Sequence, residues 1–343
     1  MQRRDALHAL ASVVVAAAAG ACGGANRAPA QATAELPRAQ LHVAPATDLV
    51  AAPALVWLVD ARPREIFANV DLIPAVHLLL SEQRLDTFAE RNGGVDLRQL
   101  QEIAVASYPD ATLFIGRGMF EPARLEKAFR ARTANLDGRA RDDGRAPDGT
   151  RLASITRMWG SAGTEREQLA ILGREAMALE RGRFGPLRVA EAFAQQKLKR
   201  AKPALRGAPL ARAAELLGDA PMRGFAPGPF DGEWAQGLGG LLKASTAFGI
   251  SVHPKSARLE VKVVLLGGWG ADAASAAQYL SAEYQRLAQV PIGRLCGLDK
   301  PLDGPRVRGG DDALVLEASL DALTVARGLR AMTGASIDEI MAH

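Results

Sequence analysis

The sequence predicts an α+β fold made of antiparallel sheet backed by helices. Three observations support this prediction. Two short apolar strands followed by an amphipathic helix recur along the chain. A stretch dense in charge, proline and glycine at residues 197–209 divides the chain into two parts of domain size. The composition, 48% hydrophobic and 23% charged over 343 residues, is that of a globular protein able to bury a sizeable core.

Residues 1–21 are predicted to be an export signal. Arg3 and Arg4 give a basic start, an apolar stretch of roughly a dozen residues follows, and small residues precede Cys22. The apolar stretch is too short to cross a bilayer, which takes about 20 residues. We therefore expect export followed by cleavage before Cys22. The alternative is an uncleaved alanine-rich helix in which the cysteine is incidental.

The same residues resemble the signal sequences of bacterial lipoproteins. Ala19-Gly20-Ala21-Cys22 is similar to the lipobox, with Ala19 where leucine is usual. Arg3-Arg4-Asp5-Ala6-Leu7 is similar to a twin-arginine export signal. The resemblance implies that Cys22 carries a lipid in the mature protein. Gly23, in place of an aspartate after the cysteine, implies the outer membrane as the destination.

Residues 22–53 are expected to form a lipid-anchored, flexible tether. They are rich in alanine, proline and glutamine and show no sustained apolar period. Such a composition favours an extended chain that holds the body away from the membrane.

The first α+β module is expected over residues 54–200, where the hairpin-and-helix pattern occurs twice. Arg117-Gly118-Met119-Phe120-Glu121-Pro122 aligns with Arg181-Gly182-Arg183-Phe184-Gly185-Pro186. Arginine, glycine and proline at a strand-to-helix corner are explained by turn geometry, so we interpret a duplicated structural element and not a binding loop. The expected elements are strands 103–108 and 112–116 with a helix from Pro122, and strands 168–172 and 176–179 with a helix from Pro186.

The second α+β module is expected over residues 201–343. Residues 258–263 alternate charged and apolar side chains, as a half-buried strand requires. Gly334 is placed to end a helix that starts at Asp321. The order of elements suggests two ferredoxin-like modules, each an antiparallel sheet backed by helices. The expected elements are a hairpin of residues 245–253 and 257–266, a helix over 271–289, a strand over 313–320 and a helix over 321–333.

Together, the tether, the paired hairpin-and-helix units and the run Gly237-Leu238-Gly239-Gly240 ahead of a strand resemble a loose group of bacterial envelope lipoproteins of unknown function. The resemblance implies a fold and a location. It implies no reaction, because no catalytic motif defines that group.

The residues themselves offer no catalytic or metal-binding motif. The histidines are scattered and there is no HExxH, so no metal site is predicted. Residues 159–163 lack the spacing of a GxSxG nucleophile elbow, and residues 237–240 lack the Lys-Ser/Thr of a phosphate-binding loop. With Cys22 lipidated, Cys296 has no disulfide partner and is expected to pack as a small hydrophobe. We predict no catalytic residue and no cofactor.

A basic run follows the first module. In a membrane-tethered protein it is a candidate contact for anionic headgroups or lipopolysaccharide phosphates. The alternative is a solvated helix end, where cations also complement the helix dipole. The run comprises Lys197, Lys199, Arg200, Lys202 and Arg206.

The sequence therefore favours a membrane-anchored lipoprotein of the cell envelope, on the periplasmic face of the outer membrane or at the cell surface. We expect a non-catalytic binding or assembly module, with the membrane and an envelope protein or lipid as partners. The alternative is a carrier or sensor of a lipid or other amphiphile, and an uncharacterised hydrolase comes third. Aromatic residues make up only 5% and basic residues are mixed with acidic ones, so no nucleic-acid partner is expected.

Overall fold

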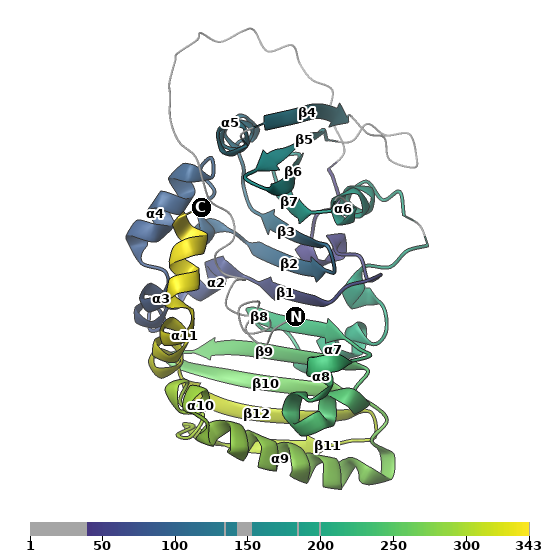
Figure 1. Ribbon diagram of the computed structural model, residues 1–343, viewed down its shortest axis with the longest axis vertical. Coiled ribbons are helices and arrows are strands. Elements are labelled where there is room, and N and C mark those ends of the chain that lie inside the picture. The colour runs from purple at the N-terminus through teal and green to yellow at the C-terminus, as the bar shows by residue number, and fades with distance from the viewer. Residues whose placement is uncertain (1–39, 134, 143–152, 184, 199, 343) are drawn as a thin grey trace.

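The computed structural model describes residues 40–133, 135–142, 153–183, 185–198 and 200–342 (Figure 1). Within them, the strands form one 12-stranded sheet in the order β11-β12-β10-β9-β8-β1-β2-β3-β7-β6-β5-β4, and neighbouring strands are antiparallel. The strands are β1 (Trp57–Ala61), β2 (Glu102–Tyr108), β3 (Ala111–Arg117), β4 (Asn135–Asp142), β5 (Ile155–Ala162), β6 (Glu165–Leu172), β7 (Ala176–Gly182), β8 (Met222–Pro227), β9 (Ala247–Lys255), β10 (Arg258–Leu266), β11 (Asp303–Gly309) and β12 (Ala313–Asp321).

Helices cover both faces of this sheet. Figure 1 shows α3, α4 and α11 along one side and α6 and α7 along the other. The α-helices are α2 (Pro63–Ala68), α3 (Ile73–Leu79), α4 (Glu82–Arg91), α5 (Pro122–Arg132), α6 (Pro186–Ala194), α7 (Leu210–Leu217), α8 (Gly232–Ala235), α9 (Ala273–Gln289), α10 (Pro291–Leu295) and α11 (Ala322–Ala342). The 3-10 helices are η1 (Ala46–Leu49), η2 (Leu97–Gln99), η3 (Ala204–Arg206), η4 (Gly237–Ala244) and η5 (Gly270–Asp272).

The two halves of the sheet share one plan. Each has a leading strand followed by a hairpin, a helix, a second hairpin and a second helix: β1 then β2-β3-α5-β6-β7-α6, and β8 then β9-β10-α9-β11-β12-α11. The strand orders β2-β3-β7-β6 and β9-β10-β12-β11 correspond. The first half differs by an inserted hairpin, β4-β5, between α5 and β6. The α+β fold with an antiparallel sheet backed by helices is confirmed, and the hairpin-and-helix unit occurs in both halves.

Within each half, the chain connections differ from those of a ferredoxin-like module. A ferredoxin-like module reads β-α-β-β-α-β, whereas each half here joins its strands as hairpins before each helix. A tight turn joins two successive strands as antiparallel neighbours. In each half, the helix that follows a hairpin therefore leads the chain to the next hairpin. The halves are joined through β1 and β8, which pair directly and place Leu58 opposite Phe225.

The apolar core is divided by the sheet. The largest cluster lies under η1, η3, α6 and α7 and includes Leu58, Leu113 and Leu187. On the opposite face, α4 and α5 bury Phe88 and Phe129 against the first half. The helix α9 covers the second half, and α3 packs with α11 over β9 and β10. None of the described helices has the length and apolar character needed to cross a membrane.

The structure differs from the expected tether over residues 40–53. Leu41, Val43, Leu49 and Val50 are buried in the main core, and residues 46–49 form η1. These apolar side chains are spaced irregularly among alanine and proline, so the stretch shows no period although it packs firmly. We refer to residues 40–51 as the lead-in segment.

The expected end of the last helix at Gly334 is wrong. The helix α11 runs from Ala322 to Ala342 without a break. Glycine ends a helix when it adopts the left-handed conformation, but it also adopts the ordinary helical one. The sequence alone does not distinguish these two uses.

Candidate functional site

The predicted anchor and export residues lie outside the described residues. These are Cys22, Arg3 and Arg4, and Lys199 of the basic run lies outside them as well. The rest of the basic run follows α6 and ends in η3, and we call residues 197, 198 and 200–206 the basic segment.

The cations of the basic segment fall into two groups. The guanidinium of Arg206 donates two hydrogen bonds to Asp48 of η1, with Nε at 2.9 Å from Oδ1. Lys197 Nζ lies 3.9 Å from the Asp142 carboxylate, at the limit of an ion pair. Arg200 and Lys202 are exposed and lack an ion-pair partner in the described part of the chain. Among the described cations of the basic segment, Arg200 and Lys202 are therefore the most available to an anionic surface.

The lead-in segment runs beside the basic segment. The His42 N–H donates to the Ala194 carbonyl oxygen at the end of α6, at 2.9 Å. The Ala204 N–H donates to the Val50 carbonyl oxygen, also at 2.9 Å, and Ala51 forms a β-bridge with Pro203. The lead-in segment is therefore adjacent to the basic segment.

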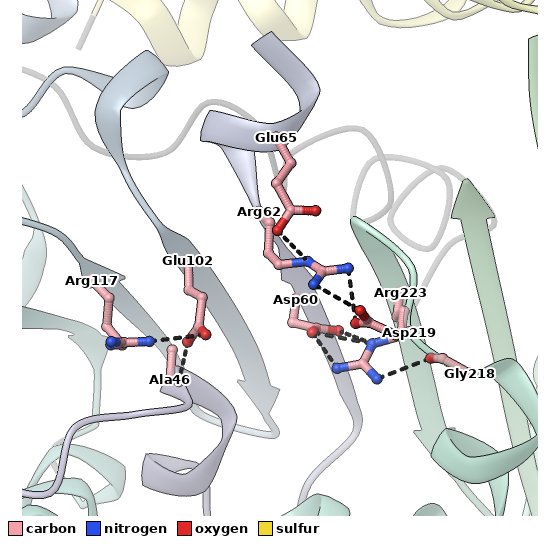
Figure 2. Close-up of polar contacts among 9 residues, drawn as sticks. All are labelled: Ala46, Asp60, Arg62, Glu65, Glu102, Arg117, Gly218, Asp219 and Arg223. Atoms are coloured by element: carbon pink, nitrogen blue, oxygen red, sulfur yellow. Dashed lines mark hydrogen bonds and ion pairs between the residues drawn. The ribbon is translucent and has the colours of Figure 1, made fainter. Parts of the chain in front are cut away.

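A second polar feature lies where the two halves of the sheet meet (Figure 2). Asp60 on β1 is directly opposite Arg223 on β8, and the Arg223 Nη2 to Asp60 Oδ2 distance is 2.7 Å. Arg223 also donates to the Gly218 carbonyl oxygen and lies over the Phe225 ring at 5.7 Å. Burial raises the pKa of Asp60, while the hydrogen bond from Arg223 opposes the rise.

Further ion pairs extend this group across neighbouring strands. Arg62 pairs with Asp219 at 2.9 Å and with Glu65 at 3.3 Å, as Figure 2 shows. Glu102 on β2 pairs with Arg117 on β3 at 2.9 Å, and Glu102 also accepts the Ala46 N–H of η1. These carboxylates are each neutralised by an arginine. These contacts join β1 to β8 through Asp60 and Arg223, and join β2 to β3 and η1 through Glu102.

An open pocket of about 390 Å³ lies beside the start of β2 and the end of β3. Its wall includes the buried Leu100 and Phe120 and the exposed Met119 and Arg64. Arg98, also in the wall, is paired with Asp96 at 2.8 Å and with Asp86 at 2.6 Å. The pocket has an apolar floor but one of its two arginines is already neutralised.

Two buried polar clusters lie on opposite faces of β5, β6 and β7. Under α6, Arg157 donates two hydrogen bonds to Glu191, and the fully buried Glu180 accepts backbone N–H groups at the start of α6. Under α5, Glu167 pairs with Arg132 at 2.8 Å and with Arg181 at 2.7 Å. Burial raises the pKa of Glu180 to about 7.

The remaining candidates carry little chemistry. Among the described residues there is no group of three or more side chains able to hold a metal ion. Cys296 is free and half-buried, and burial raises the pKa of its thiol. A raised thiol pKa disfavours the reactive thiolate.

Sequence reasoning missed Asp60, Arg223 and Glu180. Asp60 and Arg223 are 163 residues apart, so nothing local indicates their pairing. The one available signal was a charged residue after a run of apolar ones within a strand, Asp60 in Trp57–Ala61 and Glu180 in Ala176–Gly182. Such a residue must be paired or neutral when buried.

No protein-family model matches this chain, and no curated protein matches it. Solved crystal forms of TP0453 are similar to it. Crystal form III has a TM-score of 0.47 at 10% identity, covering 83% of this chain and 97% of that chain. Crystal form I has a TM-score of 0.45 at 11% identity, covering 83% of this chain and 96% of that chain. Crystal form IV has a TM-score of 0.45 at 10% identity, covering 82% and 94%. No activity and no site residue is carried over from likenesses of this size.

Proposed function

We propose that this chain is a lipoprotein of the bacterial cell envelope, anchored to the outer membrane through Cys22, whose body is a non-catalytic binding or assembly module. The observation that carries the proposal is the contact between the lead-in segment and the basic segment. A lipid on Cys22 would tether the body at the lead-in segment, so the basic segment would lie on the part of the body nearest to the point of attachment.

Electrostatics supports this orientation. Near an anionic membrane each exposed lysine or arginine contributes about 1 kcal/mol of attraction. Arg200 and Lys202 are exposed, whereas Arg206 is already paired with Asp48 and would contribute less. The exposed Leu198 lies between these cations and Lys197 and would add an apolar contact at the interface.

A binding role is favoured over catalysis by the state of the charged groups. Asp60 and Glu102, the half-buried carboxylates at the centre of the sheet, are held by Arg223 and Arg117. A general acid or base needs a side chain within reach of a substrate in a cleft. The groups at the centre of this sheet are instead used to bind one another.

The anchor is tested by expressing the full-length chain in bacteria that are fed radiolabelled palmitate. We expect label on the wild-type chain and none on Cys22→Ala, with the variant released from the outer-membrane fraction. Cys296→Ala is the matched control and should label like the wild type. An unlabelled wild-type chain would remove the lipoprotein part of the proposal.

The orientation is tested with residues 25–343 and vesicles of phosphatidylcholine with or without phosphatidylglycerol. We expect binding only to the anionic vesicles, weakened by salt, and a double variant Arg200→Gln/Lys202→Gln that binds at least about tenfold more weakly, given roughly 1 kcal/mol per cation. The control Lys243→Gln/Lys300→Gln removes two exposed cations from the second half and should bind as the wild type does. Equal loss in both variants would mean that the basic segment has no special role.

The alternative function, a carrier of a lipid or other amphiphile, requires a different kind of binding site. A carrier of a lipid encloses most of its ligand in an apolar cavity, whereas the pocket of about 390 Å³ is open and partly charged. Native mass spectrometry of the same soluble chain separates the two ideas. Extra mass that is lost on denaturation would favour the carrier, and a bare chain mass would favour a module that binds through its surface.

A further inference from the structure

Glu180 is a carboxyl group buried in the main core without a counter-ion. It lies on β7 between Leu113 of β3 and Gln168 of β6, and it is fully buried. Its Oε1 accepts the Gly185 N–H at 2.9 Å and the Leu187 N–H at 3.4 Å, at the first turn of α6. Its Oε2 has no hydrogen-bond partner. Within the described residues, no lysine or arginine forms an ion pair with it.

The charged and titratable groups that face Glu180 are few. From α6 come Glu191, which disfavours a second negative charge, and Arg188, whose effect is smaller. Glu191 is itself held by Arg157 of β5. From β2 comes Tyr108, whose hydroxyl donates to the Ala51 carbonyl oxygen. Among the described residues none supplies a direct positive partner, so ionisation leaves a buried charge with one unsatisfied oxygen.

The helix that Glu180 caps also contacts the lead-in segment. Its first turn rests on the Glu180 carboxyl, its apolar face packs on η1, and its last carbonyl group, from Ala194, accepts the His42 N–H. The basic segment follows directly from the same helix. One short helix therefore connects Glu180 to the lead-in segment.

We propose that Glu180 is a proton-controlled latch: protonated, it holds α6 and the lead-in segment on the sheet, and ionised, it favours their local opening. The geometry gives the direction of the effect. Lifting α6 exposes the carboxyl to water, where the ionised form is stable, while closing α6 over it removes that water. The proposal concerns the body itself and does not depend on the lipid anchor.

The pH range follows from the pKa. In the closed state the pKa of Glu180 is raised from 4.5 to about 7, so the closed state binds the proton more tightly than the open state. The closed state is then most favoured below the ordinary pKa of a glutamate, loses stability as pH rises toward 7, and stays at the lower level above it.

Hydrogen exchange measured by mass spectrometry on the full-length chain tests the latch. Protection factors, which remove the intrinsic pH dependence of exchange, are compared for α6, for residues 40–51 and for α9. For α6 and the lead-in segment we expect the opening constant to rise by up to about tenfold per pH unit between about pH 5 and pH 7, the limit for one linked proton. For α9 we expect no such rise.

Two variants assign the effect. Glu180→Gln keeps the shape and the acceptor oxygen without the charge, so α6 protection should lose its pH dependence. Glu165→Gln changes an exposed glutamate on the neighbouring strand and should behave as the wild type. An unchanged slope in Glu180→Gln would overturn the proposal. Should that variant not fold, the wild type decides alone, because equal slopes in α6 and α9, or no slope in α6, would overturn it as well.

Discussion

At the scale of single residues, the buried ionisable side chains of this protein lie in local groups, and the free-energy cost of burying a charge explains the contacts in each group. A charge taken out of water must be met by an opposite charge or by several hydrogen bonds. Glu167 follows the first course, between Arg132 and Arg181. Glu180 follows neither fully: one of its oxygens accepts two N–H groups at the start of α6, the other has no partner, and burial raises its pKa to about 7. The two groups face opposite sides of the same strands.

The Glu167 group gives a prediction about stability. Glu167→Gln removes the negative charge and leaves the Arg132 guanidinium buried without neutralisation, which costs about 3–5 kcal/mol when a buried pair is broken. Urea unfolding should report a loss of that size, with an unchanged slope. Glu165→Gln, exposed on the same strand, should stay within about 0.5 kcal/mol of the wild type. A loss below about 1 kcal/mol in Glu167→Gln would show that Arg132 finds water or another partner.

At the scale of elements, some parts of this fold could be predicted from the sequence and others could not. The hairpins β2-β3 and β6-β7 and the helices α5 and α6 are contiguous, and Pro122 and Pro186 mark where the two helices begin. Local periodicity and capping are sufficient for such elements. In contrast, β11 contains Pro305 and several charges, and its pairing with β12 is irregular. A strand of that kind exists because a neighbouring strand binds it, and no local pattern indicates it.

The same distinction between local and long-range signals explains which residues of the candidate site could be predicted from the sequence. The basic segment is contiguous and was visible as a run of charges, so its members could be named in advance. The central pairs were not visible, because Asp60 and Arg223 meet only after β1 and β8 pair across 163 residues of sequence. Likewise, the lead-in segment packs by irregularly spaced side chains such as Leu41 and Leu49, which a search for periodicity does not detect.

Helix packing supplies a prediction at the same scale. Gly328 in α11 is buried against α10, and a Cβ atom there would lie 2.5 Å from the Leu295 carbonyl oxygen. Alanine in a helix is favoured over glycine by about 1 kcal/mol, but overpacking against a backbone costs about 1–3 kcal/mol or more. Because backbone atoms cannot move aside cheaply, we expect Gly328→Ala to be destabilising by about 1–2 kcal/mol in urea unfolding.

A glycine without close neighbours provides the control for Gly328→Ala. No atom lies within 4 Å of the position a Cβ would take at Gly304 in β11, so Gly304→Ala should leave stability unchanged or slightly raised. A stabilised Gly328→Ala would mean that α10 and α11 can separate freely.

At the scale of the whole molecule, the duplicated halves are not independent of each other. Their leading strands β1 and β8 form the middle of one sheet, and Leu58 and Phe225 lie opposite each other in the main core. Separating the halves would expose two strand edges and the apolar side chains beside them. It would also break the pairs Asp60–Arg223 and Arg62–Asp219. Open strand edges with apolar faces are sites of aggregation, so each half needs the other.

This dependence can be measured by dividing the chain after Arg206, which leaves the lead-in segment, α6 and η3 together in the first fragment. We expect residues 40–206 and 207–343 to aggregate or remain partly folded when made separately. Mixed during refolding, they should form a one-to-one complex that unfolds in a single transition, because the β1–β8 pair restores a continuous sheet. Fragments that fold separately, stay monomeric and do not bind each other would mean that β1 and β8 pair only because the chain connects them. In the intact chain, such independence would appear as two unfolding transitions in place of one.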